Sequence, residues 1–263
     1  MRIIDSHVHI YPEKIAARAS AGIGEFYSMP VKYDGTVTRL REICERNNIS
    51  KCVACSVATV SEQVVSINNF LAESVAQSGG FIAGLCALHP DMSEVEIESE
   101  LLRIKALGLI GIKIHPDFQR FRVDGARAYK IYDSARGKFP ILIHAGDKRF
   151  GFSQPAKLAK VMRDFPDLTI IAAHFGGWSE WGDVKCLAGF DNLYVDTSSS
   201  LYELIPETAN KLINMFGGER VLFGTDYPMW DADGELKFIE RLKLPERVRE
   251  FILYKNAERV YKL

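Results

Sequence analysis

The sequence predicts an α/β protein in which eight parallel strands close into a single (β/α)8 TIM barrel. Eight short apolar runs follow one another at regular intervals, and amphipathic helical stretches lie between them. Strands that are apolar along their whole length and alternate with helices indicate a parallel sheet with both faces covered. Eight such units are the number in the closed barrel. The alternative is an open doubly wound sheet, but the glycine-rich phosphate turn of that fold is missing after the first strand.

Length and composition restrict the class of protein. The chain has 263 residues, a size that an α/β barrel fills as one domain, so we expect a single domain over 1–263. Hydrophobic residues make up 47%, charged residues 25% and the net charge is -1, which argues against a nucleic-acid binder. No signal peptide and no apolar run of about 20 residues is evident. We therefore expect a cytoplasmic enzyme with a small-molecule substrate and no membrane partner.

The first element, at residues 2–10, is a hydrophobic strand that carries His7 and His9. Side chains two apart on a strand point to the same face, so both imidazoles are directed to one place. Two neutral imidazoles at a strand end can supply two ligands to one divalent ion. An accidental histidine pair on a surface strand is the alternative, and the positions of the other histidines decide between the two.

Residues 11–35 show no sustained period and contain Pro12, Gly22 and Gly24. A long irregular segment in a compact domain is commonly functional, so we expect an active-site loop here. From Thr36 an apolar stripe predicts a helix that ends at 47–48.

The other strands are expected at 51–57, 81–88, 109–115, 140–145, 168–174, 192–196 and 220–225, and a helical tail at 246–263 is expected to pack on the barrel wall. Cys52 and Cys55 form a C-x-x-C pair, which is typical of redox or zinc sites. Residues three apart on a strand face opposite sides, so we expect buried packing cysteines instead.

The polar residues at the strand ends carry the functional argument. Active sites of such barrels lie at the carboxyl ends of the strands. All six histidines lie at or near a predicted strand end, and Asp226 follows the eighth strand. The histidines are His7 and His9 on strand one, His89 after strand three, His115 on strand four, His144 on strand five and His174 on strand six. Chance is a poor explanation of this arrangement.

The arrangement of His7, His9, His144 and Asp226 resembles the metal-dependent amidohydrolase superfamily. Within it, the chain is most similar to the amidohydrolase-2 group, which includes aminocarboxymuconate-semialdehyde decarboxylase. The matching pieces span the chain: DSHVH at 5–9, GIKIHP at 111–116, IH at 143–144, AHFGG at 173–177, FGTDYP at 223–228 and NAERVY at 256–261. Together they are specific for the fold and the metal site, and they do not specify the substrate.

The resemblance implies a site in which His7, His9, His144 and Asp226 bind one divalent ion, with zinc expected. Three imidazoles and a carboxylate suit zinc and leave a position open for water. Asp226 is then the general base for that water. His174, beside the metal, would orient the water or stabilise an oxyanion. A homo-oligomer, such as a dimer, is also implied.

Strand four leaves the number of metal ions open. Two-metal members of the superfamily carry a bridging carboxylated lysine or glutamate on this strand, and Lys113 lies there beside His115. Lys113 is either that bridge or a buried ion-pair partner. His115 is either a ligand of a second ion or a contact to the substrate. One ion per chain is favoured.

Three further residues are candidates for contact with the substrate. Arg149 lies in the loop after strand five, and an arginine fork can bind a carboxylate. Tyr227, with Trp178 and Trp230, could wall the pocket. His89 could contact the substrate or pack at its strand end.

These features predict a hydrolase that uses a metal-activated water to cleave a C–N or C–O bond. The substrate would be an amide, ester or lactone of a small, carboxylate-bearing molecule. The alternative is a non-oxidative decarboxylase of an unsaturated or aromatic acid, which would use the same ligands. A non-catalytic scaffold would have been indicated by a lost ligand, and none is lost.

Overall fold

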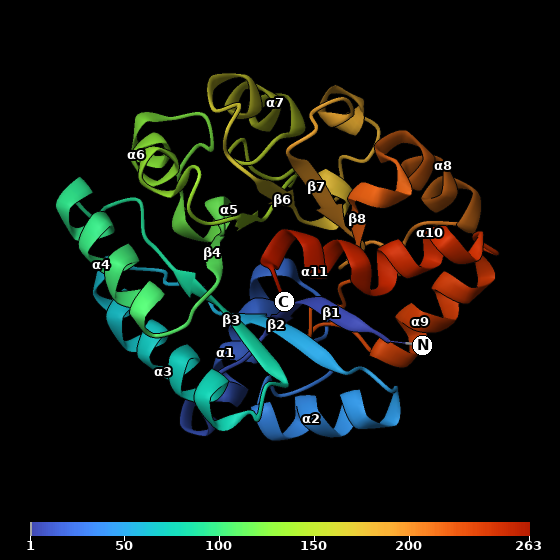
Figure 1. Ribbon diagram of the computed structural model, residues 1–263, viewed down its shortest axis with the longest axis horizontal. Coiled ribbons are helices and arrows are strands. Elements are labelled where there is room, and N and C mark those ends of the chain that lie inside the picture. The colour runs from blue at the N-terminus through green and yellow to red at the C-terminus, as the bar shows by residue number, and fades with distance from the viewer. Residues whose placement is uncertain (1) are drawn as a thin grey trace.

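The computed structural model describes residues 2–263 and contains one sheet of eight parallel strands in the order β1 to β8 (Figure 1). The strands are β1 (Ile4–His9), β2 (Lys51–Cys55), β3 (Ile82–Ala87), β4 (Gly111–Ile114), β5 (Ile141–Ile143), β6 (Ile170–Ala172), β7 (Leu193–Asp196) and β8 (Val221–Leu222). The helices are α1 (Glu13–Tyr27), α2 (Val37–Arg46), α3 (Val64–Gln77), α4 (Glu94–Ala106), α5 (Pro116–Gln119), α6 (Ala126–Ala135), α7 (Pro155–Asp164), α8 (Pro206–Phe216), α9 (Ala232–Arg241), α10 (Glu246–Glu250) and α11 (Asn256–Tyr261). The predicted (β/α)8 barrel is confirmed.

The barrel is closed by hydrogen bonds between β1 and the chain that follows β8. The backbone N–H of Ser6 donates to the carbonyl of Phe223 at 2.8 Å, and that of Asp226 donates to the carbonyl of His7 at 2.9 Å. β8 itself is only two residues long, shorter than the predicted run at 220–225. The contact with His7 nevertheless holds Asp226 beside the end of β1.

The strands carry two separate sets of apolar side chains. Ile141, Ile143 and Ile170 pack in the cluster that contains the surrounding helices, whereas Leu142 and Ile171 belong to a second cluster inside the barrel. This alternation follows from the period of two along a strand. The barrel therefore has a packed interior below its polar end.

The C-terminal tail closes one end of the barrel. α11 crosses in front of the strands near the centre of Figure 1, and Ala257, Val260 and Tyr261 pack on the interior cluster. The tail was expected on the barrel wall. It covers the end of the barrel instead, because this removes from water the apolar side chains that would otherwise be exposed there. The functional residues lie at the opposite ends of the strands.

The expectation of an irregular segment at 11–35 is wrong for its first half, which forms α1. The only buried residues of this helix are Ala16 and Ser20, so its inner face shows no stripe of large apolar side chains. The remainder is irregular and is anchored by the N–H groups of Lys32 and Tyr33, which donate to the carbonyl of Pro228. The segment therefore still lies over the chain that follows β8.

Cys52 and Cys55 are buried and belong to different apolar clusters, as expected. The expectation that both only pack is not met by Cys55, whose Sγ lies 3.7 Å from Nδ1 of His9 and forms a group of potential metal donors with His7 and His9. The predicted helix after Thr36 is α2, whose N-terminus is capped by the Thr36 hydroxyl. Among the described residues, no helix is both long and apolar enough to cross a membrane.

Candidate metal centre and active site

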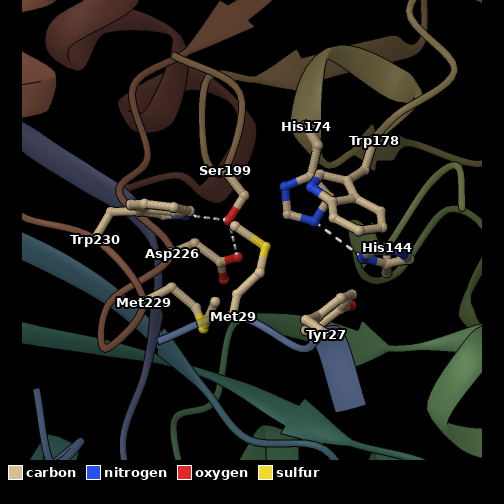
Figure 2. A pocket seen from close by; sticks show the side chains of 9 residues that line it. All are labelled: Tyr27, Met29, His144, His174, Trp178, Ser199, Asp226, Met229 and Trp230. Carbon is tan, nitrogen blue, oxygen red and sulfur yellow. Dashed lines mark hydrogen bonds between the residues drawn. The ribbon is translucent and has the colours of Figure 1, made fainter. Parts of the chain in front are cut away.

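Six polar side chains converge at the carboxyl ends of the strands. They come from β1 and from the residues that follow β4, β5, β6 and β8, and all are buried or nearly so: His7, His9, His115, His144, His174 and Asp226. Figure 2 shows Asp226, His174 and His144 around one cavity. Five of the six histidines of the sequence therefore meet at one place.

Three atoms within this group form a compact triangle. Nε2 of His7 and Nε2 of His9 are 3.2 Å apart, and they lie 3.4 and 3.2 Å from Oδ1 of Asp226. A tetrahedral zinc ion with bonds of about 2.0–2.2 Å requires ligand atoms about 3.3–3.6 Å apart. The donor set and its spacing thus fit one divalent ion.

Asp196, at the end of β7, fixes the orientation of His7. Its Oδ2 lies 2.9 Å from Nδ1 of His7, and its Oδ1 accepts the backbone N–H of His174 at 2.9 Å. Burial would raise the pKa of Asp196, but His7 and His174 hold it at about 2. The ionised Asp196 therefore keeps the proton of His7 on Nδ1 and directs the lone pair of Nε2 into the site, where Nζ of Lys113 lies 2.7 Å away.

Asp226 is held in a conformation that residues other than glycine seldom adopt, with φ of +60°. Its Oδ2 accepts a hydrogen bond of 2.5 Å from the hydroxyl of Ser199, which accepts one of 2.8 Å from Nε1 of Trp230 (Figure 2). Burial opposes ionisation, but His7 and His9 keep the pKa of Asp226 well below its ordinary value. Asp226 is thus a carboxylate whose Oδ1 faces the imidazoles.

His144 and His174 face each other across the cavity. Nε2 of His144 lies 2.8 Å from the carbonyl of Gly146, and Nδ1 of His174 lies 2.9 Å from the carbonyl of Ser198. Carbonyls only accept, so these outer nitrogens carry the protons. Nδ1 of His144 and Nε2 of His174, the nitrogens that face the cavity, lie 3.0 Å apart, and each then directs a lone pair toward the other. Burial lowers the pKa of both rings, which favours their neutral forms and leaves the two lone pairs free to bind a metal cation.

Lys113 contacts the triangle, and His115 contacts the histidine pair. Nζ of the buried Lys113 is 2.7 Å from Nε2 of His7. The ring of His115 stacks on His144 at 4.0 Å, and its Nε2 is 2.9 Å from the hydroxyl of Tyr27. His115, Asp117 and His144 form a further group of donors close enough for an ion. Both strand-four residues therefore reach the site.

Two of the candidate substrate contacts, Arg149 and Tyr227, are engaged by other residues of the protein. The guanidinium of Arg149 is bound by both oxygens of Asp147 and lies against the ring of Phe26, so it is already engaged. The hydroxyl of the buried Tyr227 donates to the carbonyl of Thr36, and Tyr227 does not line the cavities of the site.

His89 is also separate from the centre. It lines a surface pocket with Arg120 and Arg127, and Phe118 stands between that pocket and the ring of His115. The structure thus does not bring His89 to the site. Trp178 and Trp230 line the site cavity, as the sequence suggested.

The space inside the site is small. Two adjoining cavities share His144, His174 and Asp226, and their volumes of about 10 and 20 Å³ are each about that of one water. Tyr27, at the end of α1, and Met29 after it line this space (Figure 2). A substrate therefore needs side chains of this lining to move before it can reach the site.

Sequence reasoning missed Asp196, Ser199 and Tyr27. Asp196 ends its strand, so the same strand-end argument that selected the histidines would have selected it. Ser199 and Tyr27 carry no local signal, because their roles arise from contacts with residues far away in the chain.

The family model for amidohydrolases matches residues 4–263. The chain therefore belongs to the amidohydrolase family. A comparison with curated proteins found no match.

Solved structures with the same fold include both decarboxylases and a hydrolase. The 5-carboxyvanillate decarboxylase of Sphingomonas paucimobilis is 16% identical over 100% of this chain and 99% of its own, with a TM-score of 0.78. The dihydroxybenzoic acid decarboxylase of Polaromonas sp. JS666, with bound manganese and 2-nitroresorcinol, is 19% identical over 99% and 97%, with a TM-score of 0.73. A probable 2-pyrone-4,6-dicarboxylic acid hydrolase of Acinetobacter baumannii is 14% identical over 100% of both chains, with a TM-score of 0.73. At these identities the likeness shows the fold alone.

Proposed function

We propose that this protein is a metal-dependent hydrolase that cleaves a C–N or C–O bond in an amide, ester or lactone of a small molecule. The observation that supports this most strongly is the triangle of His7 Nε2, His9 Nε2 and Asp226 Oδ1, with sides of 3.2–3.4 Å. Family membership agrees with this proposal.

His7, His9 and Asp226 would hold the ion, and His144 is the fourth proposed ligand. Zinc is the proposed ion, because imidazole nitrogen with one carboxylate oxygen is a donor set that it accepts readily. When bound, the ion supplies a Lewis acid and lowers the pKa of a water molecule in its shell.

The protein's own residues would supply the proton transfers. The ionised Asp226 can accept a proton, while the hydroxyl of Ser199 keeps its second oxygen in place. His174 is held through Nδ1 by the carbonyl of Ser198, so its Nε2 faces the cavity and can bind or release a proton there. Once protonated on Nε2, His174 would stabilise negative charge that develops on the substrate carbonyl.

A decarboxylase is the second candidate, and Lys113 is the observation that favours it. Decarboxylation needs a group that holds the substrate carboxylate beside the metal. Arg149 is already engaged by Asp147, but Nζ of Lys113 lies inside the site, 2.7 Å from His7. Nζ is already paired with His7, a metal-ligand candidate, and hydrolysis needs no carboxylate clamp, so hydrolysis is the function that we favour.

The two functions are separated by a substrate panel on the zinc-loaded protein. Amides, esters and lactones are assayed by titration of released acid, and aromatic and unsaturated acids by release of carbon dioxide. Hydrolysis that is lost in His174→Ala supports the proposal. Carbon dioxide release without hydrolysis, abolished in Lys113→Met, would replace it with the decarboxylase.

A further inference from the structure

A second cavity, of about 430 Å³, adjoins the site. Trp230 and Met229 line both this cavity and the small cavity beside Asp226. In Figure 2, Trp230 lies at the far side of the site from Tyr27 and His144. The volume is within the range of about 300–1,000 Å³ that is typical of small-molecule pockets. The site cavity is too small for a substrate, so the second cavity offers the nearest room for one.

The walls of the second cavity are flat and mostly apolar. The rings of Tyr202 and Trp230 stack at 4.2 Å with an angle of 12° between their planes. Leu201 and Phe238 complete the apolar lining. Because the two rings are parallel and in contact with each other, a flat ligand would stack on the outer face of the pair, where stacking adds to the free energy of apolar burial.

The polar groups of the cavity carry little net charge. Glu235 lines it, is only 5% exposed, and its Oε2 has no hydrogen-bond partner among the described residues. Burial raises the pKa of Glu235 well above its ordinary value, which favours the uncharged carboxyl, and an ionised carboxylate at this position would repel an anion. Lys32 and Asp231 neutralise each other through an ion pair of 2.7 Å. An uncharged ligand group therefore matches this cavity better than an anion.

A hydrogen-bonded chain links this cavity to the site. The same Trp230 that forms one wall donates through Nε1 to Ser199, which donates to Asp226. A group that stacks on Trp230 in the second cavity would therefore contact the hydrogen-bond donor of Ser199, the residue that orients Asp226.

We propose that the second cavity binds an uncharged, flat, aromatic or heteroaromatic group of the substrate, while the bond to be cleaved lies beyond Trp230, beside Asp226. The assignment of this group to the substrate depends on the proposed hydrolase function, whereas its binding to the cavity does not. The substrate class is then an amide, ester or lactone attached to such a ring.

Gly234, on the first turn of α9, provides a selective test. It lines the cavity, and a Cβ atom added there would meet no other atom within 4 Å. Gly234→Leu should occupy part of the cavity without straining the helix. Gly22 of α1 offers the matched control, because it is also helical with open space around an added Cβ and lines none of the cavities described above.

The probe is 2-naphthol, an uncharged flat molecule, titrated calorimetrically into the zinc-loaded full chain. We expect binding to the native protein and to Gly22→Leu, and binding weaker by about tenfold or more in Gly234→Leu with unchanged zinc content and Tm. The anion 2-naphthoate should bind the native protein more weakly than 2-naphthol. Absent binding, or equal binding by Gly234→Leu, would overturn the inference.

The same experiment separates this inference from the proposed function. A protein that binds zinc and hydrolyses amides or esters but does not bind 2-naphthol contradicts the cavity inference alone. A protein that binds 2-naphthol in a Gly234-dependent manner but shows no hydrolysis contradicts the hydrolase alone.

Discussion

Asp196 Oδ2 and His7 Nδ1 lie 2.9 Å apart, fully buried, and this contact determines which nitrogen of His7 faces Asp226 and His9. A carboxylate behind a metal-binding imidazole fixes its tautomer and raises its basicity. The end of β7 thus contributes to the centre without supplying a proposed ligand.

Asp196→Asn should weaken zinc binding by about 10–100-fold, because the amide can turn its NH2 group toward Nδ1 and no longer fixes the tautomer of His7. The measurement is zinc affinity by competition with a chelator. Asp191→Asn is the control, since Asp191 is fully exposed and far from the centre. Unchanged affinity in Asp196→Asn would show that His7 is oriented by other contacts.

His174→Ala should retain zinc and reduce kcat by about 10²–10⁴-fold, because the proton-transfer group is lost while the triangle remains. Metal content and steady-state kinetics, measured on the same preparation, check this expectation. If the variant loses its zinc, His174 is a ligand and the proposed donor set must be revised.

Glu235→Gln should change the dependence of stability on pH. The raised pKa of Glu235 means that the folded state holds a proton that the unfolded state releases above its ordinary pKa of 4.5. Below about pH 4.5 this carboxyl is protonated in both states and does not change the free energy of unfolding with pH. As pH rises from there toward the pKa of the folded state, the free energy of unfolding of the native protein falls.

The glutamine variant lacks this loss, so its Tm should exceed that of the native protein by about 2 °C or more at pH 8 and by less at pH 5. Thermal unfolding of both proteins at the two pH values measures the difference. Glu240→Gln, on the exposed face of the same helix, should show no such trend. A constant difference at both pH values would mean that Glu235 is ionised in the folded state.

Tyr27→Ala should speed the entry of substrate and expose the histidines of the site to reagents in solution. The Tyr27 ring packs on Trp178 at 5.0 Å, and its hydroxyl contacts His115, so its removal opens the space above His144. Diethyl pyrocarbonate modification of histidine, followed by peptide mapping, should then label His144 or His115 several-fold faster than in the native protein. Equal labelling rates would show that α1 does not control access.

The sequence allowed the barrel and most of the centre to be predicted, because both follow from local patterns. Apolar runs that end in a histidine locate His144 and His174 at one end of a parallel sheet without knowledge of tertiary contacts. α1 was missed because its buried face consists of Ala16 and Ser20, which give no hydrophobic period.

Contacts between distant segments could not be predicted in this way. The position of Tyr27 against His115 and the link from Trp230 to Asp226 depend on how loops pack over the barrel. Arg149 was predicted as a substrate contact, although the partner that engages it, Asp147, is only two residues away. Sequence spacing alone does not show which charged neighbours pair.

The proposed metal centre is checked by the metal content of the chain, measured by elemental analysis on protein purified without added metal. We expect one zinc per native chain, none in Asp226→Asn or His144→Ala, and one in His115→Ala, with all variants folded. A native chain without bound metal, or an Asp226→Asn variant that retains its full content, would contradict the proposed centre. Two ions that fall to one in His115→Ala would instead mean that strand four holds a second ion.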